Sequence, residues 1–351
     1  MQMQIRFRET MLILKRDFRP ILRSCWVLFI ATLCRILYYS GVLRTFCQNF
    51  FKDRICIIMC HGLIEDATDM IADDKFHIRI KTFLKFYNLL KEVCPPVTVQ
   101  DLEQKLKKDI YQHRWGGVLF TFDEAYLGVM DIIPMLVGDK FGVILFCVQS
   151  ATEEGFFLPT AISRVTNSMR REKVLDLLDL PKGSSDHEVI SKLQLIRQTS
   201  NFDFLKILNN QGISKKDRVM NKQELRHMSS LGVVIGSHTL SHPDLCAISK
   251  KELHSELALS RDYFKSVIGK DIRWFSYPGG SFNSQVIKAV RETGYEFAVT
   301  AVPPGFIKTT NQSNQFLELP RVDIYGEADN PFFSLARLCG LEALFRRKFY
   351  G

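Results

Sequence analysis

The chain has 351 residues, of which 46% are hydrophobic and 24% are charged, and its formal net charge is +9. This composition excludes a disordered or fibrous protein and allows one large α/β barrel or two modest domains. The body of the chain has no basic stripe with interleaved aromatic side chains, which argues against nucleic-acid binding.

Residues 1–50 carry most of the net charge: their eight basic and two acidic side chains give +6 of the net +9. From Cys25 to Leu43 the chain is mostly apolar, but Arg35 interrupts it, and an arginine at the centre of a spanning helix is costly. An amphipathic helix on a membrane surface or on the protein's own surface fits this pattern. A signal anchor with a cytoplasmic N-terminus is the alternative.

The expected location is cytoplasmic or inner-membrane-associated, and not clearly secreted. Residues 1–50 show no A-x-A-like cleavage site, so a cleaved signal peptide is not expected. The nine cysteines are odd in number and form no C-x-x-C pair. Buried free thiols in a reducing compartment are the expected state of these residues.

Short apolar runs rich in β-branched residues recur along the chain and end in polar residues, which is typical of buried parallel strands. Segments with helical spacing separate these runs, so strands and helices alternate. This alternation predicts a parallel barrel with its site at the carboxyl ends of the strands. The expected strands lie at 54–62, 117–122, 141–148, 232–235, 274–280, 297–302 and 317–322.

Three regions are expected along the chain: a basic, apolar helical region at 1–50, a catalytic domain at 51–330 and a C-terminal helix at 331–351. Within the domain, residues 151–218 carry no chemical motif and are predicted to form a helical insertion over one mouth of the barrel. The other expected helices lie at 81–93, 127–136, 222–231, 249–267 and 283–292.

His238 and His242 follow one of the predicted strands. Two imidazoles four residues apart would share one side of a helical turn, so both could face one metal ion. Imidazole is a preferred ligand of zinc and similar divalent ions. Histidines in a polar loop can also be surface groups or locally hydrogen-bonded groups, so the pair alone does not decide between these readings.

Asp123 and Glu124 follow another predicted strand directly. As a structural alternative to a catalytic role, the two carboxylates could cap the helix expected at 127–136 and favour its positive N-terminus. A third strand end carries Tyr277, Pro278, Gly279 and Gly280, which predict a tight turn. Polar groups therefore follow three strands that are expected to share one sheet edge.

Together these three strand ends resemble the polysaccharide deacetylase family, the NodB-homology domain of carbohydrate esterase family 4. Residues 121–126, Thr-Phe-Asp-Glu-Ala-Tyr, resemble its first motif, TFDDG or TFDDAY. Residues 238–243, His-Thr-Leu-Ser-His-Pro, match its second motif, H[ST]xxHP. Residues 275–280, Phe-Ser-Tyr-Pro-Gly-Gly, resemble the F-x-YP-x-G form of its third. The resemblance runs from about Ile55 to Ile324.

The resemblance implies a distorted (β/α) barrel of about seven parallel strands, here with the helical insertion. It also implies a divalent metal, most often zinc, held by Glu124, His238 and His242, with Asp123 as the base that takes a proton from water. The turn at Tyr277, Gly279 and Gly280 would contact the substrate and offer backbone N–H groups to the developing oxyanion.

The chain departs from the family pattern at three positions. Glu124 replaces the metal-binding aspartate, and its extra methylene moves the carboxylate by on the order of 1.5 Å. Ser276 replaces the arginine that orients the base, and Arg321 is the candidate substitute. No Leu-x-x-His motif near the C-terminus supplies a general acid, so His61 is the candidate proton donor, with a core or surface histidine as the structural alternative.

The leading hypothesis is a metal-dependent hydrolase that removes acetyl groups from a bacterial polysaccharide or its precursor. One alternative is a catalytically degenerate barrel that only binds glycans, which Glu124 and the missing acid would favour. Another is an amidase acting on a non-sugar substrate. The expected partners are an acetylated glycan and, through residues 1–50, a membrane surface, with no nucleic acid. The sequence leaves N- and O-deacetylation open.

Overall fold

The computed structural model describes residues 24–65, 77–107, 116–157, 218–301, 306–308, 316–324 and 330–349, with short pieces between 172 and 192. Residues 1–23 and most of the predicted helical insertion at 151–218 lie outside the described residues, so the structural predictions made for them stay predictions.

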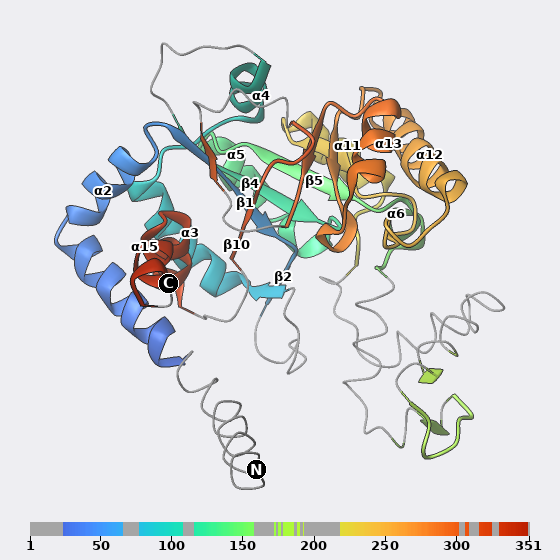
Figure 1. The fold of residues 1–351 in the computed structure, drawn as a ribbon, viewed down its shortest axis with the longest axis horizontal. Coiled ribbons are helices and arrows are strands. Elements are labelled where there is room, and N and C mark those ends of the chain that lie inside the picture. Colours follow the sequence, from blue (N-terminus) through green and yellow to red (C-terminus); the bar gives the residue numbers. More distant parts are fainter. Residues whose placement is uncertain are drawn as a thin grey trace, which may run out of the picture.

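Seven parallel strands form one curved sheet in the centre of the molecule (Figure 1). Their order is β10–β1–β4–β5–β6–β7–β8, and each neighbouring pair is parallel. The segment before β10 bridges to β8 at Leu319 and Val299, while β10 itself pairs with β1, which brings the two edges of the sheet together. The predicted distorted barrel of about seven parallel strands is therefore confirmed. The strands are β1 (Arg54–Cys60), β4 (Gly117–Asp123), β5 (Val143–Cys147), β6 (Val234–Ser237), β7 (Trp274–Ser276), β8 (Phe297–Val299) and β10 (Val322–Asp323).

Three further strands are too short to show a periodic pattern in the sequence and were not predicted. Strand β9 (Phe306–Lys308) adds to β1 in the antiparallel direction. Strands β2 (Gly62–Ile64) and β3 (His77–Arg79) pair with each other in parallel as a separate two-stranded sheet. This small sheet continues the chain directly from the end of β1, on the same side as the carboxyl ends of the barrel strands.

Helices cover the outside of the barrel. In Figure 1, α11, α12 and α13 lie on one side of the strands, and α2, α3 and α15 lie on the other. The sequence-based helix starts are accurate where a capping residue marks them. Asn283 caps α13 by accepting from the N–H groups of Gln285 and Val286, and Ser249 opens α12 with a capping box. The helices are α2 (Val42–Phe50), α3 (Ile80–Val93), α4 (Val99–Lys107), α5 (Ile133–Gly138), α6 (Gln149–Glu154), α11 (Lys222–Ser230), α12 (Lys250–Ile268), α13 (Ser284–Glu292), α14 (Pro331–Leu338) and α15 (Leu341–Phe349).

Two predicted helices are each divided. The helix expected at 127–136 consists of a 3-10 turn, η1 (Leu127–Val129), and α5, because Pro134 in the first turn of α5 favours a new helix start there. The single C-terminal helix expected at 331–351 is divided into α14 and α15. Gly340 lies between them with φ of 72°, a left-handed conformation that ends α14.

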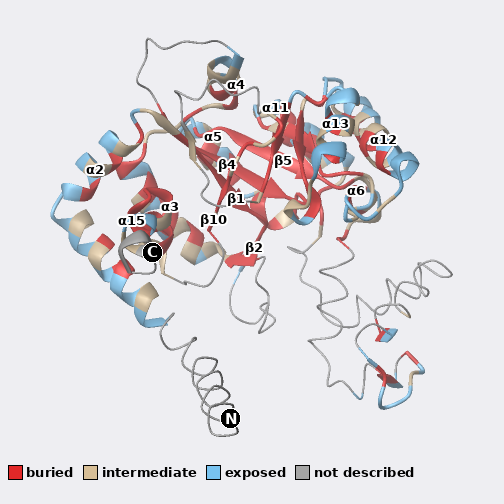
Figure 2. Cartoon of the chain, viewed as in Figure 1, coloured by how far each residue is buried: buried red, intermediate tan, exposed pale blue. Residues whose placement is uncertain are grey.

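Side chains alternate between the inside and the outside of the barrel, and the strands are buried on both faces (Figure 2). On β1, Ile55 and Ile57 belong to an inner cluster, whereas Cys56 and Ile58 belong to the outer cluster beneath the helices. Burial on both faces explains why the strand sequences read as continuous apolar runs.

The first described helix, Ser24–Tyr39, and α2 meet at an angle of 101°. No single described helix is long and apolar enough to cross a membrane, although this bent pair would be by combined length and composition. Ile30, Ala31 and Cys34 are buried in the outer core cluster, so one face of the first helix packs on the protein itself.

The packing of α12 generates a stability prediction. Phe264 is fully buried on this helix, whereas Leu259, on the same helix, is 54% exposed. Phe264→Ala is expected to lower the free energy of unfolding by about 3–5 kcal/mol because it leaves a cavity. Leu259→Ala, the matched control, is expected to change it by no more than about 0.5 kcal/mol. Chemical denaturation followed by circular dichroism measures both values, and equal effects would contradict this packing.

Candidate active site

The alternation of side chains along the strands sends polar groups into one end of the barrel. Leu119 of β4 faces the inner cluster, so Thr121 and Asp123, at the same parity, point inward at the carboxyl end of that strand. By the same rule, Ser276 shares the inner face of β7 with Trp274. The barrel interior is therefore apolar over most of its depth and polar at the end where the candidate residues lie.

Arg321 holds Asp123 with two parallel hydrogen bonds. Its Nη1 donates to Asp123 Oδ1 at 2.8 Å, and its Nη2 donates to Asp123 Oδ2 at 2.9 Å. The same guanidinium donates to the hydroxyls of Thr121 and Ser276 and to the carbonyl of Thr300. All five donors are engaged, which fixes the carboxylate plane. Arg321, expected as a substitute for the missing arginine, lies where that role requires it to be.

This ion pair controls the protonation of Asp123. Burial alone would raise the pKa of its carboxyl group, but the positive charge of Arg321 holds that pKa well below its usual range. Both side chains are almost fully buried. Asp123 is therefore ionised at neutral pH, and the capping role considered as an alternative for it does not describe this carboxylate, which faces the barrel interior.

Glu124, His238 and His242 converge on one point. One ligand atom from each lies within 4.8 Å of the other two. The Nε2 atoms of His238 and His242 are 3.6 Å and 3.8 Å from Glu124 Oε1. Two ligand atoms bound tetrahedrally to zinc lie about 3.4 Å apart, so the distance from Glu124 Oε1 to each imidazole nitrogen is already close to that of a zinc site. The extra methylene of Glu124 does not keep its carboxylate away from the two histidines.

The chemistry of these groups fits a divalent cation. Glu124 Oε2 is buried and makes no hydrogen bond among the described residues. Burial lowers the pKa of His238 and lowers that of His242 to about 4, so both imidazoles offer lone pairs at neutral pH. Burial also raises the pKa of Glu124, and a bound cation would oppose that shift. The Nδ1 of His238 lies 2.7 Å from the carbonyl oxygen of Ser276, which directs Nε2 toward the cluster.

The two motif loops use strained backbone to place these side chains. Glu124 and Ala125 have φ of 61° and 54°, and Thr239 and His242 have φ of 71° and 63°. Left-handed conformations are uncommon for residues other than glycine and concentrate at functional sites. His238 and His242 therefore do not lie on a helical turn, as the spacing argument assumed. Their rings meet, with centroids 4.7 Å apart, because the intervening loop folds back.

Glu256 of α12 stabilises that loop and was not singled out from the sequence. Its carboxylate accepts hydrogen bonds from the backbone N–H groups of Leu240 and Ser241 at 3.0 Å and 2.9 Å, and from the Ser241 hydroxyl at 2.6 Å. These three bonds tie the segment between the two histidines to a long helix. No sequence signal marks this contact, because Glu256 has the spacing of an ordinary surface glutamate.

His61 and His77 lie on the other side of Glu124. The Nε2 of His61 is 3.8 Å from Glu124 Oε2, so the predicted histidine reaches the cluster. His77, which the sequence did not single out, contacts the ring of Tyr126 with centroids 4.6 Å apart. Its ring lies over Gly62, where a Cβ would be only 2.1 Å from His77 Cδ2. The pairing of β2 with β3 places His77 against Gly62, and Gly62 is the one sequence feature that reflects this contact.

The third motif contributes mainly to packing. The Tyr277 hydroxyl donates to the carbonyl of Leu317 at 2.8 Å, and the side chain is 1% exposed. The N–H of Gly280 donates to the carbonyl of Tyr277 within the turn, at 2.9 Å. Both groups are therefore engaged inside the protein. The substrate-binding and oxyanion roles predicted for Tyr277, Gly279 and Gly280 stay predictions.

Comparison with known sequences gives a consistent assignment. The sequence model described as polysaccharide deacetylase matches residues 114–298, which is more than half of the chain. YxkH of Bacillus subtilis, a protein named for the polysaccharide deacetylases, is 31% identical over 84 residues, which are 24% of this chain and 30% of YxkH. Peptidoglycan-N-acetylmuramic acid deacetylase PdaA of the same organism is 28% identical over 94 residues, which are 26% of this chain and 36% of PdaA. The alignments thus span about a third of these curated relatives.

Comparison with solved structures supports the fold. The deacetylase PplD of Streptococcus pyogenes, in complex with acetate, superimposes with a TM-score of 0.55 at 16% identity, covering 81% of this chain and 98% of PplD. BC0361, a polysaccharide deacetylase from Bacillus cereus, gives a TM-score of 0.51 at 16% identity, covering 81% of this chain and 69% of that protein. From the extent of the sequence match, with a barrel of the same kind, the chain belongs to the polysaccharide deacetylase family.

Proposed function

We propose that this protein is a metal-dependent carbohydrate deacetylase that hydrolyses an acetyl group on a glycan. The observation that carries the proposal is the convergence of Glu124, His238 and His242 beside a carboxylate, Asp123, that is held ionised. This arrangement combines a three-ligand site with an adjacent base, which is the set of groups that metal-assisted hydrolysis requires.

The proposed reaction begins with activation of a water molecule. A divalent ion bound by the three ligands would polarise the acetyl carbonyl and lower the pKa of that water. Asp123 would accept the proton, because its Oδ2 lies 4.0 Å from Nε2 of His238 and so faces the same space. Arg321 orients Asp123 for this transfer by fixing both carboxylate oxygens.

The second half of the reaction releases acetate. The bond between the acetyl carbon and the sugar nitrogen or oxygen breaks, and the leaving group takes a proton. His61 is the proposed carrier of that proton, because its Nε2 lies across Glu124 from the two histidine ligands. Burial lowers the pKa of His61, so its imidazole is neutral at rest. In the proposed sequence it receives the proton that Asp123 took from water and passes it to the leaving nitrogen or oxygen, which returns Asp123 to its ionised form.

The proposed substrate class is an N-acetylated amino sugar within a glycan. The support for this choice is the relative PdaA, which is named for N-acetylmuramic acid in peptidoglycan. O-acetyl groups would present the same carbonyl to the same residues. A comparison of acetate release from N-acetylated and O-acetylated glycans distinguishes the two, and the absence of release from all of them, with zinc bound, would favour a barrel that only binds glycans.

Substitutions of Asp123 and His238 are expected to separate turnover from metal binding. Asp123→Asn keeps the shape of the side chain and removes the base, so acetate release is expected to fall about 10²- to 10⁴-fold while bound zinc is retained. His238→Ala is expected to lower zinc affinity. Metal analysis and acetate release from an N-acetylated amino-sugar oligomer measure both. Activity retained by Asp123→Asn would contradict the assignment of the base, and zinc affinity unchanged in His238→Ala would contradict the ligand assignment.

Glu124 predicts the result of a family-like substitution. In Glu124→Asp the carboxylate withdraws by on the order of 1.5 Å from the two imidazoles, which already lie 3.6 Å and 3.8 Å away. We therefore expect weaker zinc binding and lower turnover, although aspartate is the usual residue of the family motif. Zinc titration of both proteins measures the change. Tighter binding or faster turnover in Glu124→Asp would show that Glu124 compromises the native site.

Arg321 predicts a split between kcat and KM. Arg321→Lys keeps the charge but cannot make the two parallel bonds to Asp123, so kcat is expected to fall and KM to stay within about two-fold. The variant Arg337→Lys, at a partly exposed pair with Asp323, is the matched control and is expected to leave both constants unchanged. If Arg321→Lys and Arg337→Lys lower the stability of the protein equally and Arg321→Lys leaves kcat unchanged, the role of Arg321 is structural alone.

A further inference from the structure

The helix Ser24–Tyr39 and α2 have an apolar outer face in addition to the face that packs on the core. This outer stripe consists of Leu28, Phe29, Ile36, Tyr39 and Val42, whose exposed fractions are 64%, 48%, 61%, 71% and 53%. Only two other large hydrophobic side chains in the described chain are exposed, Leu259 and Leu344. The concentration of five on one helix pair marks an interaction surface, because apolar patches of this kind are rare on the surfaces of soluble monomers.

The position of the outer stripe follows from helical spacing. Residues 28, 29, 36 and 39 recur at intervals that place them along one side of the helix, while Ile30, Ala31 and Cys34 occupy the side buried in the protein. A helix that is apolar on both sides is stable only when both sides are covered. The protein's own core covers one side, and within the part of the chain that the structure describes the outer stripe is left exposed.

The geometry of the helix pair favours a position in the plane of a membrane surface. The two helices are bent by 101°, and Gly41 at the bend has φ of 76°. One side of the first helix is fixed on the core through Ile30 and Cys34, which are fully buried. Crossing a bilayer would require both helices to straighten and to leave this packing. Lying in the interface lets the outer stripe enter the acyl boundary with the packing intact.

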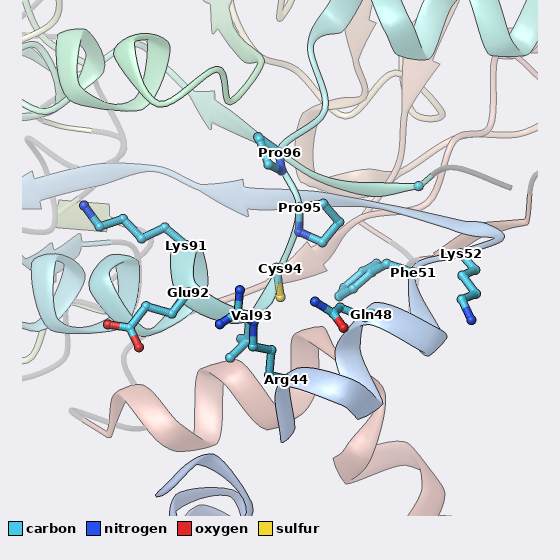
Figure 3. A pocket seen from close by; sticks show the side chains of 11 residues that line it. Arg44, Gln48, Phe51, Lys52, Lys91, Glu92, Val93, Cys94, Pro95 and Pro96 are labelled. Carbon is cyan, nitrogen blue, oxygen red and sulfur yellow. The ribbon is translucent and has the colours of Figure 1, made fainter. Parts of the chain in front are cut away.

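Cationic side chains accompany the outer stripe. Arg35 is exposed on the first helix, with its guanidinium 5.9 Å from the ring centroid of Tyr39. Arg44 of α2 lines a hollow of about 330 Å³ together with Lys52 and Lys91 (Figure 3). This hollow is on a different side of α2 from Val42, because residues two apart in a helix point about 200° apart. The one carboxylate in this lining, Glu92, accepts a hydrogen bond from the Tyr38 hydroxyl.

The charges select an anionic partner. Arg35 is exposed beside Tyr39 of the outer stripe, and residues 1–50 as a whole hold six more positive than negative charges. Lys and Arg bind phosphate oxygens through charge-assisted hydrogen bonds, and basic residues beside an apolar surface favour anionic lipids. Apolar side chains flanked by cations therefore match a bilayer of anionic phospholipid better than a second copy of this chain, which would bring the same positive charges together.

We propose that the outer stripe docks on the surface of an anionic lipid bilayer, with Leu28, Ile36 and Val42 in the acyl boundary and Arg35 at the headgroup phosphates. This inference goes beyond the proposed deacetylase activity and does not depend on it. It gives the basic N-terminal region a role in location, whereas the proposed catalysis belongs to the carboxyl ends of the strands.

The test is sedimentation of the full-length protein with lipid vesicles. Binding is expected to vesicles of phosphatidylglycerol mixed with phosphatidylcholine, to weaken as salt rises, and to be much weaker with phosphatidylcholine alone. Leu28→Glu combined with Ile36→Glu is expected to lower binding at least ten-fold. Arg35→Glu is expected to lower it by at least about five-fold.

The matched control is Leu259→Glu, which places a charge at a similarly exposed leucine on α12 and is expected to leave vesicle binding unchanged. Thermal unfolding followed by circular dichroism verifies that each variant is folded. Wild-type binding by the Leu28 and Ile36 double variant, or no binding of the wild type to anionic vesicles, would overturn the proposal. So would a dimer that forms without lipid and is lost in the same double variant, since the outer stripe would then be a subunit interface.

Discussion

The rest of the candidate site depends on the buried ion pair between Asp123 and Arg321. A lone carboxylate inside the carboxyl end of the barrel would lose its hydration without compensation. Removing one partner of such a buried pair typically lowers the stability of the fold by about 3–5 kcal/mol. Arg321 compensates for this loss and also contacts Thr121, Ser276 and Thr300. These contacts join β4, β7 and the end of β8 to the segment before β10. The interaction that sets the charge of Asp123 therefore also holds together the strands at which the barrel closes.

This pair separates the properties of two neighbouring carboxylates. Asp123 is the last residue of β4 and faces Arg321, so its pKa is depressed, whereas burial raises the pKa of Glu124. The left-handed backbone at Glu124 and Ala125 turns the second carboxylate away from the arginine and toward His238 and His242. Carboxylates whose environments push their pKa values apart are suited to different tasks. One is held in its charged form, which the proposed role as a base requires, and the other is a group that a cation would stabilise.

Much of the fold could be predicted from the sequence because the barrel strands are buried on both faces and read as continuous apolar runs. The capping residues Ser249 and Asn283 located the starts of two helices, because a cap is a chemical signal that is local in the sequence. The small sheet of β2 and β3 could not be predicted, because three-residue strands have no period and their pairing is decided by tertiary contacts. His77 was missed with it. The convergence of His238 and His242 was expected for a reason that the structure corrects, because a strained loop tied to Glu256, and not a helical turn, brings them together.

The central claim is that Glu124, His238 and His242 bind one divalent cation beside Asp123. Anomalous X-ray diffraction at the zinc absorption edge, from crystals grown with zinc, tests it most directly. We expect one strong peak at about 2.0–2.2 Å from the Glu124 carboxylate and from Nε2 of both histidines, with Asp123 outside ligand distance and still paired with Arg321. A peak coordinated by Asp123 in place of Glu124, or no peak among these side chains, would contradict it.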